Sequence, residues 1–350
     1  MNTLFSIASQ FINGVTHITP LGQGLINDTY RVDSTSLSFV LQRINRTVFP
    51  RPEKIMANLS TLTEHIARKD SKSVKLQIPG LLNTLTNESF YQSENGDCWR
   101  AISYIPESES LETMGSIKNA EQVGFALGHF HRLVSDLEPS LLHDTLPGFH
   151  ITPNYLKYYH QVLLNLTQTP NTFCADFISR FEHITDDLEF AINQGFLSLR
   201  VIHGDPKLNN FLFDKQTRNI ISIIDLDTVK PGLIHYDIGD CLRSCCFESD
   251  PVVSFNLEIC AVLLKSYLSE ADVFFSEHDY RYLYAAIRLI PFELGLRFYT
   301  DYLEGNRYFK VVEPEQNLQR AVNQFKLCAS IMSQEIAIKA LILESSIKKT

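Results

Sequence analysis

The stretch of residues 201–227 restricts what this chain can fold into more than any other part of the sequence. It places Asp205 just after an apolar run, where a strand would end and a loop begin. Asn210 lies five residues later, and Asp225 follows the β-branched run 220–224, which is typical of a buried strand. The pattern therefore predicts two neighbouring loops, joined by a hairpin, that each present a carboxylate.

Phosphoryl transfer from a nucleotide uses the three groups of this stretch in this order. A carboxylate such as Asp205 can orient an acceptor hydroxyl and receive its proton, while Asn210 and Asp225 supply oxygen ligands for Mg²⁺. Lys207 adds a cation that can offset the charge of the transferring group. Asp and Asn are also common turn residues, so one such pair alone would be read as backbone capping. The coincidence of all three groups favours a phosphotransferase site in which Asp205 and Lys207 are catalytic.

The same residues carry a resemblance to the aminoglycoside phosphotransferase and choline kinase family, whose catalytic loop has His-Gly-Asp as this chain does at 203–205. Four longer segments are similar to the N-acetylhexosamine 1-kinase branch of that family, namely Lys207 to Asn210, Ile224 to Val229, Pro231-Gly232 and Tyr236 to Asp240. The resemblance implies an α+β, protein-kinase-like fold of two lobes with ATP and Mg²⁺ between them. It also implies transfer of the γ-phosphate to the anomeric hydroxyl of N-acetylglucosamine or N-acetylgalactosamine.

Residues 1–106 are expected to form the N-lobe, an antiparallel sheet with one helix that covers the nucleotide. Gly22 and Gly24 lie in a predicted hairpin, where glycines let backbone amides approach phosphates closely. Kinase-type sites take a lysine from the third strand. Gln42 occupies that position here, and Arg43 is the nearest cation. We therefore predict a phosphate contact from Arg43, with a plain solvated strand residue as the alternative.

Residues 107–350 are expected to form the C-lobe, which carries the catalytic loop and the acceptor site. Arg297 and Tyr302 belong to an aromatic-rich segment that again resembles the hexosamine kinase branch. A guanidinium can hydrogen-bond sugar hydroxyls or an amide carbonyl, and aromatic rings stack on a pyranose face. We therefore predict Arg297, Tyr302 and Asp205 as acceptor contacts, with an ordinary amphipathic helix as the alternative. Asp227 is a candidate for a second metal or sugar contact.

Hydrophobic periodicity predicts the remaining elements. Apolar residues at spacings of four, three and four make one stripe of a helix at 52–70, and an Asn-Gly pair at 95–96 indicates a hairpin. The predicted strands are 15–21, 26–32, 38–43, 89–92, 98–105, 211–213 and 220–224, the further predicted helices are 117–134, 153–166, 175–194, 253–268, 281–303 and 315–345, and 230–232 is predicted to be a turn.

The chain departs from the hexosamine kinase pattern at two places. Gly204-Asp205-Pro206 stands where Asn-Asp-Thr is expected, and Leu25 stands where a His is expected. Three alternatives therefore remain: a kinase of another small alcohol such as an aminoglycoside or choline, a kinase of another sugar, and a nucleotide-binding pseudokinase that lacks the third-strand lysine. Asp237, Asp240 and Arg243 resemble the family segment that holds the catalytic loop in place.

Composition excludes some classes of partner. The net charge of −9 leaves no basic excess for a nucleic-acid surface, and no apolar run approaches the roughly 18 residues of a membrane span. The first residues lack the basic region of a signal peptide. Seven cysteines without a CxxC pair are read as reduced, buried thiols rather than a zinc site. We expect a cytoplasmic enzyme that acts on a small molecule; the oligomeric state stays open.

Overall fold

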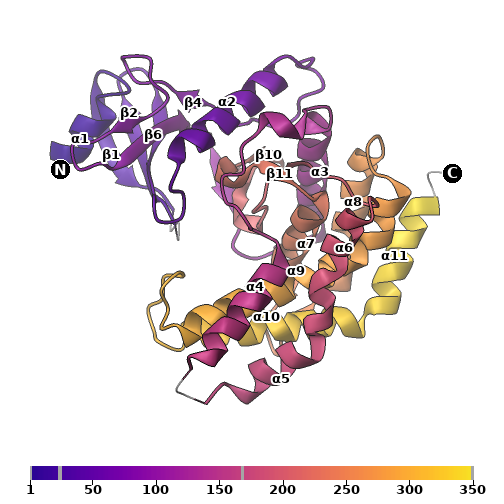
Figure 1. Cartoon of the computed structure of the whole chain (residues 1–350). Coiled ribbons are helices and arrows are strands. Elements are labelled where there is room, and N and C mark those ends of the chain that lie inside the picture. The colour runs from indigo at the N-terminus through magenta and orange to yellow at the C-terminus, as the bar shows by residue number, and fades with distance from the viewer. Residues whose placement is uncertain (1, 23–25, 167–168, 348–350) are drawn as a thin grey trace.

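The computed structural model describes residues 2–22, 26–166 and 169–347 and consists of two lobes (Figure 1). The N-lobe is built on an antiparallel sheet, and the larger C-lobe is mostly helical. This arrangement confirms the α+β, protein-kinase-like fold that the resemblance implies. The boundary predicted after residue 106 falls between β6 (Cys98–Ser103), the last strand of the N-lobe sheet, and β7 (Ser108–Ser110), which pairs with a C-lobe strand.

The N-lobe sheet has the strand order β1-β2-β3-β6-β4, and β5 also pairs with β6. Side chains alternate between its two faces. On one face Leu41, Trp99 and Ala101 pack with Phe11 and the short helix α1 (Asn2–Ala8) in a separate apolar cluster. The other face carries Gln42 and Arg100, which are cross-strand neighbours. The remaining strands are β1 (Val15–Pro20), β2 (Asp28–Ser34), β3 (Ser38–Ile44), β4 (Leu81–Leu82) and β5 (Tyr91–Gln92).

Helix α2 (Pro52–Ala67) connects the cores of the two lobes. Its predicted apolar stripe is buried, but the two halves of the stripe pack differently. Ile55 joins an N-lobe cluster with Ile44 and Cys98, whereas Leu59 and Leu62 belong to the large C-lobe core. The sheet is therefore held against the C-lobe by one continuous helix.

The C-lobe begins with short strands that frame the catalytic loops. Strands β10-β9-β7 form one small sheet, and β11 pairs with β8 in another.

No helix within the described parts of the chain is long and apolar enough to cross a membrane. The strands are β8 (Arg200–Ile202), β9 (Phe211–Asp214), β10 (Ile220–Ile223), β11 (Lys230–Gly232), β12 (Phe247–Glu248) and β13 (Ser254–Phe255), and the α-helices are α3 (Ile117–Val134), α4 (Thr152–Leu164), α5 (Thr172–Phe181), α6 (Asp187–Asn193), α7 (Ile234–Cys245), α8 (Leu257–Ala271), α9 (Glu277–Leu303), α10 (Gln316–Ser333) and α11 (Glu335–Ile347).

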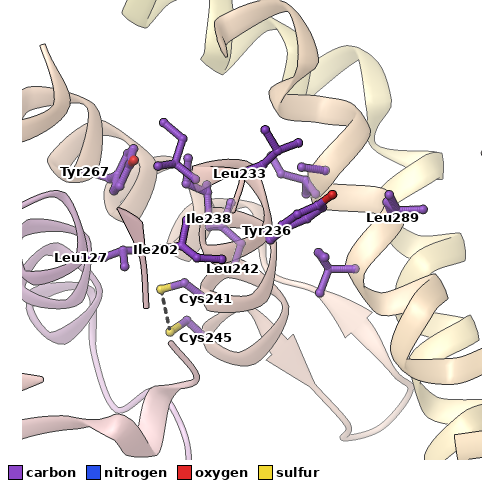
Figure 2. Packing of buried hydrophobic residues seen from close by; sticks show 14 of the residues in the cluster. Leu127, Ile202, Leu233, Tyr236, Ile238, Cys241, Leu242, Cys245, Tyr267 and Leu289 are labelled. Atoms are coloured by element: carbon purple, nitrogen blue, oxygen red, sulfur yellow. Dashed lines mark hydrogen bonds between the residues drawn. The ribbon is translucent and has the colours of Figure 1, made fainter. Parts of the chain in front are cut away.

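Helix α7 lies inside the C-lobe core. Figure 2 shows its apolar side chains, such as Ile238 and Leu242, among residues from α3, α8 and α9. The two thiols of Cys241 and Cys245 lie 4.0 Å apart on this helix. All seven cysteines are buried and free. Because α7 is surrounded by packed helices, a polar residue near its first turn has a fixed position relative to β8 and the catalytic loop.

Three predicted elements differ from the structure. The region predicted as one helix at 175–194 contains α5, a 3₁₀ turn and α6. The region 315–345 is broken at Gln334, whose side chain donates a hydrogen bond to the Phe255 carbonyl at 2.9 Å. The segment 230–232 is a strand rather than a turn because it pairs with β8, next to the catalytic loop. In the last two cases a contact with a distant segment accompanies the difference.

Candidate active site

The start of the catalytic loop is held by a buried aspartate in the first turn of α7. Asp237 accepts hydrogen bonds from the backbone N–H groups of His203, at 2.6 Å, and Gly204, at 2.8 Å. The ring of His131, on α3, contacts the same carboxylate at 2.9 Å. The loop-holding role expected for Asp237 therefore has a direct structural basis. Asp240, one turn later, pairs with Arg243 of its own helix instead, at 2.8 Å.

Gly204 lets the catalytic loop pack directly against the loop that follows β10. Its φ is +89°, and a Cβ atom there would lie 2.5 Å from the backbone oxygen of Thr228. The Thr228 hydroxyl in turn donates to the His203 carbonyl at 2.8 Å. The two loops predicted to be neighbours are therefore in contact, and only glycine fits at their closest point.

Asp205 and Lys207 lie side by side at the surface of the catalytic loop. The Lys207 ammonium donates to the Asp205 carboxylate at 2.7 Å, and both side chains are about one-third exposed. Burial lowers the pKa of Lys207, but Asp205 and Asp225 outweigh it and the pKa is raised. Asn210 closes the loop by donating from its amide nitrogen to the Asp205 carbonyl at 2.8 Å. The structure therefore brings these predicted residues together.

Asp225 presents a carboxylate that suits a cation. It adopts a left-handed conformation with φ 64° and ψ 52°, at the turn between β10 and the 3₁₀ helix η4 (Leu226–Thr228). Burial, together with the nearby charges of Asp227 and Asp205, raises its pKa to about 6, although Lys207 acts in the opposite direction. Among the described residues none donates a hydrogen bond to this side chain. A divalent cation would relieve this accumulation of negative charge.

The donor set at these loops fits Mg²⁺ rather than a metal held by protein alone. Asn210 uses its amide nitrogen within the loop, so its side-chain oxygen is the atom that it can offer beside Asp225. In the part of the chain that the structure describes, no three His, Cys, Asp or Glu side chains form a metal site. Mg²⁺ is commonly bound by one or two carboxylates plus phosphates and water. The metal assignment of Asn210 and Asp225 stays a prediction.

The structure describes two of the three N-lobe residues that are predicted to contact the nucleotide, and they lie in different surroundings. Gly22 has φ +72° and open space beside it, whereas Gly24 lies outside the described residues. Arg43 is half-exposed and pairs with Asp28 and, at 3.5 Å, with Asp97. Because strand residues alternate, Arg43 lies on the face of the sheet opposite to Gln42. Its phosphate contact stays a prediction.

Sequence reasoning missed Arg100, which occupies the position across from Gln42 on the neighbouring strand. The Arg100 side chain is only 3% exposed, and its guanidinium pairs with Asp227 of the C-lobe. The second carboxylate oxygen of Asp227 accepts a hydrogen bond from Asn27 at 2.8 Å. Asp227 therefore connects the lobes, and both of its oxygens are occupied. Only strand register could have revealed Arg100, since Gln42 and Arg100 are far apart in sequence.

A cavity of about 230 Å³ has Arg297 and several aromatic side chains, among them Phe149, in its wall. The guanidinium carbon of Arg297 lies 5.0 Å from the ring centre of Phe149, 5.1 Å from that of Tyr155 and 5.6 Å from that of Phe309. Tyr302 is elsewhere, with its hydroxyl donating to Glu315 at 3.1 Å. Of the two predicted acceptor residues on α9, the structure places only Arg297 at this cavity.

His150 lies between the cavity wall and the catalytic loop, since its ring centre is 3.9 Å from that of the wall residue Phe149. Its Nε2 lies 3.0 Å from the Gly204 carbonyl, and its Nδ1 lies 3.0 Å from Glu293, which is also the carboxylate nearest to Arg297. Both partners only accept, so both ring nitrogens carry protons and the ring is an imidazolium. Burial lowers the pKa of His150, but Glu293 and the Gly204 carbonyl outweigh it and the pKa is raised. Sequence reasoning gave no role to His150.

Replacing His150 by Gln is expected to destabilise the fold in a pH-dependent way. Because the folded pKa lies above the ordinary value of 6.5, the stabilisation from the imidazolium is complete below that pH and is lost as pH rises through the folded pKa. The free energy of unfolding of the variant should therefore be lower than wild type by about 2 kcal/mol near pH 6, and the difference should shrink at alkaline pH. Urea unfolding monitored by circular dichroism across this range would measure it.

The matched control is His160→Gln, since His160 also contacts a carboxylate, that of Glu182 at 3.2 Å, but is 52% exposed. An exposed pair contributes little to stability, so this variant should differ little from wild type. A deficit of the His150 variant that stays constant as pH rises would contradict the imidazolium assignment.

Comparison with known proteins shows which family this chain resembles. The sequence profile of the "Phosphotransferase enzyme family" matches residues 17–262, well over half of the chain. The fold is similar to that of a microcompartment-associated aminopropanol kinase, with a TM-score of 0.68 and 14% identity over 97% of this chain and 99% of that one.

Two further solved structures are similar over almost the whole chain. A choline kinase from Cryptosporidium parvum has a TM-score of 0.63 and 14% identity over 98% of both chains. An aminoglycoside phosphotransferase from Alicyclobacillus acidocaldarius has a TM-score of 0.62 and 14% identity over 96% of both chains. These likenesses show the fold, while the match of residues 17–262 shows the family. The chain therefore belongs to the phosphotransferase enzyme family and is a kinase of that family.

Proposed function

We propose that this enzyme transfers the γ-phosphate of ATP to the anomeric hydroxyl of an N-acetylhexosamine. The observation that carries the proposal is the cavity beside the catalytic loop, which combines aromatic rings with the guanidinium of Arg297. Rings of this kind stack on a pyranose face, and a guanidinium donates to hydroxyls and to an acetamido carbonyl. An acceptor bound there would be near the loop that carries Asp205, because the His150 ring packs against Phe149 of the wall and contacts the Gly204 carbonyl at 3.0 Å.

The hydrogen-bond donors of the cavity wall suit an acceptor that offers oxygen atoms. The Asp301 carboxylate is occupied by the backbone N–H groups of residues 307, 308 and 309, at 2.8, 2.7 and 3.0 Å. The nearby Glu293 is occupied by His150 and Thr152. Among the described residues of the wall, Arg297 is therefore the charged side chain that still has hydrogen-bonding groups to offer, and these are donors. A sugar that offers oxygen acceptors matches it.

In the proposed reaction Asp205 orients the acceptor hydroxyl and receives its proton. Lys207, whose pKa is raised by the carboxylates of Asp205 and Asp225 despite its burial, offsets the charge that develops on the transferring group. Mg²⁺ held by Asn210 and Asp225 would supply charge neutralisation of the phosphates. Positioning and electrostatics provide most of the acceleration, because the loose transition state asks little of the base.

A panel of acceptors tests this proposal and its alternatives together. The purified enzyme would be incubated with ATP, Mg²⁺ and N-acetylhexosamines, other sugars, amino alcohols or aminoglycosides, with products identified by mass spectrometry and NMR. A hexosamine 1-phosphate is the expected product. Phosphate on a non-anomeric oxygen would defeat the 1-kinase assignment. Turnover only with cationic alcohols, such as those named for the aminopropanol and choline kinases of similar fold, would defeat the assignment of a sugar acceptor. No acceptor-dependent ADP release would favour a pseudokinase.

Replacing Arg297 by Gln is expected to raise the acceptor KM by roughly tenfold, the factor given by about 1.4 kcal/mol of lost interaction. The nucleotide KM should stay at the wild-type value, because Arg297 lies at the acceptor cavity. Steady-state kinetics with each substrate varied in turn would measure both constants. Arg320→Gln is the control, since Arg320 lies 5.6 Å from the ring centre of Phe298 but outside the cavity wall. Equal effects of the two variants on the acceptor KM would contradict the assignment.

A further inference from the structure

A row of polar side chains crosses the N-lobe sheet. Thr29 on β2 is opposite Gln42 on β3, and Gln42 is opposite Arg100 on β6. The amide nitrogen of Gln42 donates to the Thr29 hydroxyl at 3.1 Å, and its oxygen accepts from Arg100 at 3.0 and 2.7 Å. The third-strand position is therefore neutral in this chain, and the positive charge of the row lies one strand further on.

The charge at the end of this row meets the loop that carries the predicted metal ligand. Arg100 pairs with Asp227, and the two side chains are 3% and 2% exposed. Asn27, which directly precedes β2, donates to the second oxygen of Asp227 at 2.8 Å, and the Thr145 hydroxyl donates to the Asp227 backbone oxygen at 2.8 Å. Asp227 is thus bonded to two points of the N-lobe and one of the C-lobe, two residues beyond Asp225.

Such a buried ion pair fixes the relative position of its two segments more than it stabilises the fold. The loss of hydration on burial of two charges largely offsets their attraction, and a pair of well-packed apolar residues is often as stable. The pair does require one geometry, because a displaced partner would leave an unpaired charge away from water. It therefore fixes the η4 turn relative to the sheet, and with it the direction from which Asp225 enters the site.

We infer that Arg100 is the positioning residue of the N-lobe: through Asp227 it aligns the metal-binding loop with the nucleotide-covering sheet, in place of the absent third-strand lysine. The inference rests on the nucleotide and Mg²⁺ of the proposed function but not on the identity of the acceptor. It predicts that the Arg100–Asp227 pair supports the metal-dependent part of nucleotide affinity.

The test is a double-mutant cycle on nucleotide binding by the full-length enzyme. Calorimetry would measure the Kd of AMP-PNP, with and without Mg²⁺, for wild type, Arg100→Gln, Asp227→Asn and the double variant. Each single variant is expected to weaken Mg²⁺-dependent binding by roughly tenfold, and the double variant by no more than the worse single one, because coupled partners are not additive. Binding without Mg²⁺ should change less than about twofold. Arg100→Lys, which keeps the charge, should restore part of the affinity.

The calorimetric measurements distinguish a displaced metal-binding loop from a loss of folded protein. Irreversibly misfolded protein would lower the binding stoichiometry without changing Kd, whereas reversible partial unfolding would weaken binding with and without Mg²⁺ by the same factor. If Arg100→Gln fails to fold, the double variant, which removes both buried charges, carries the test. An unchanged Kd in the Arg100 variants, or additive losses in the double variant, would overturn the inference. Arg46→Gln, an exposed arginine that donates to the Gly96 carbonyl at 3.1 Å, should match wild type. If the wild-type enzyme binds nucleotide but phosphorylates no acceptor of the panel, the proposed function fails while the inference on Arg100 stands.

Discussion

Replacing Asp205 by Asn is expected to lower kcat by about 10²–10⁴-fold, the range that a positioned general base contributes. The amide keeps the shape of the carboxylate but cannot receive a proton. The affinity for nucleotide should stay nearly at the wild-type value, because the loop contacts that involve the Asp205 backbone, such as the bond from Asn210 at 2.8 Å, are kept. ADP release in the presence of the acceptor would measure kcat, and calorimetry would measure nucleotide affinity.

Asp214→Asn is the matched control for this experiment. Asp214 ends β9, on the same hairpin, and its exposed carboxylate accepts the Thr217 backbone N–H at 2.7 Å. An Asn side chain can accept the same bond, so kcat should stay within about twofold of wild type. If Asp205→Asn also kept wild-type turnover, the role given to Asp205 would be wrong.

Replacing Asp237 by Asn is expected to lower the free energy of unfolding by about 3 kcal/mol and to reduce kcat as well. Each carboxylate oxygen of Asp237 accepts a backbone N–H, from His203 at one and from Gly204 at the other. In the variant one oxygen becomes an NH₂ group, which faces an N–H donor and leaves it unsatisfied in the core. The loop that carries Asp205 would then shift. Urea unfolding and steady-state kinetics would measure the two effects.

Asp136→Asn provides the matched control, because Asp136 also contacts a histidine, His65 at 3.1 Å, but its side chain is 65% exposed. Exposed pairs contribute at most about 1 kcal/mol, so this variant should remain stable and active. Equal losses of stability in the two variants would show that the position of Asp237 under the catalytic loop has no special effect.

The residues of the catalytic loops could be predicted because their chemistry depends on short sequence spacing. Asp205, Lys207 and Asn210 lie in one loop, and the hairpin that brings Asp225 beside it is formed by adjacent strands. Local patterns also predicted the N-lobe strands other than β4, and the helix at 117–134, since apolar periodicity is a property of each segment alone. The wrong prediction of a turn at 230–232 concerns a segment whose conformation depends on a distant partner, strand β8.

Arg100, the charged neighbour of Gln42, could not be found from local sequence patterns. Arg43 is next to the third-strand position in sequence, but neighbours in a strand point to opposite faces, and Arg43 pairs with Asp28 and Asp97. Arg100 faces Gln42 only because β3 and β6 are adjacent and in one particular register. Nothing in either segment alone specifies that register.

The sequence by itself determined the fold class, the family resemblance and the order of the groups at the catalytic loops, because periodicity and motif spacing are local. Only the tertiary structure decided which charges meet. It paired Arg100 with Asp227, placed His150 between Gly204 and Glu293, and put Arg297 rather than Tyr302 at the cavity. Such pairs join segments far apart in the chain, so their partners are fixed by packing and register rather than by spacing.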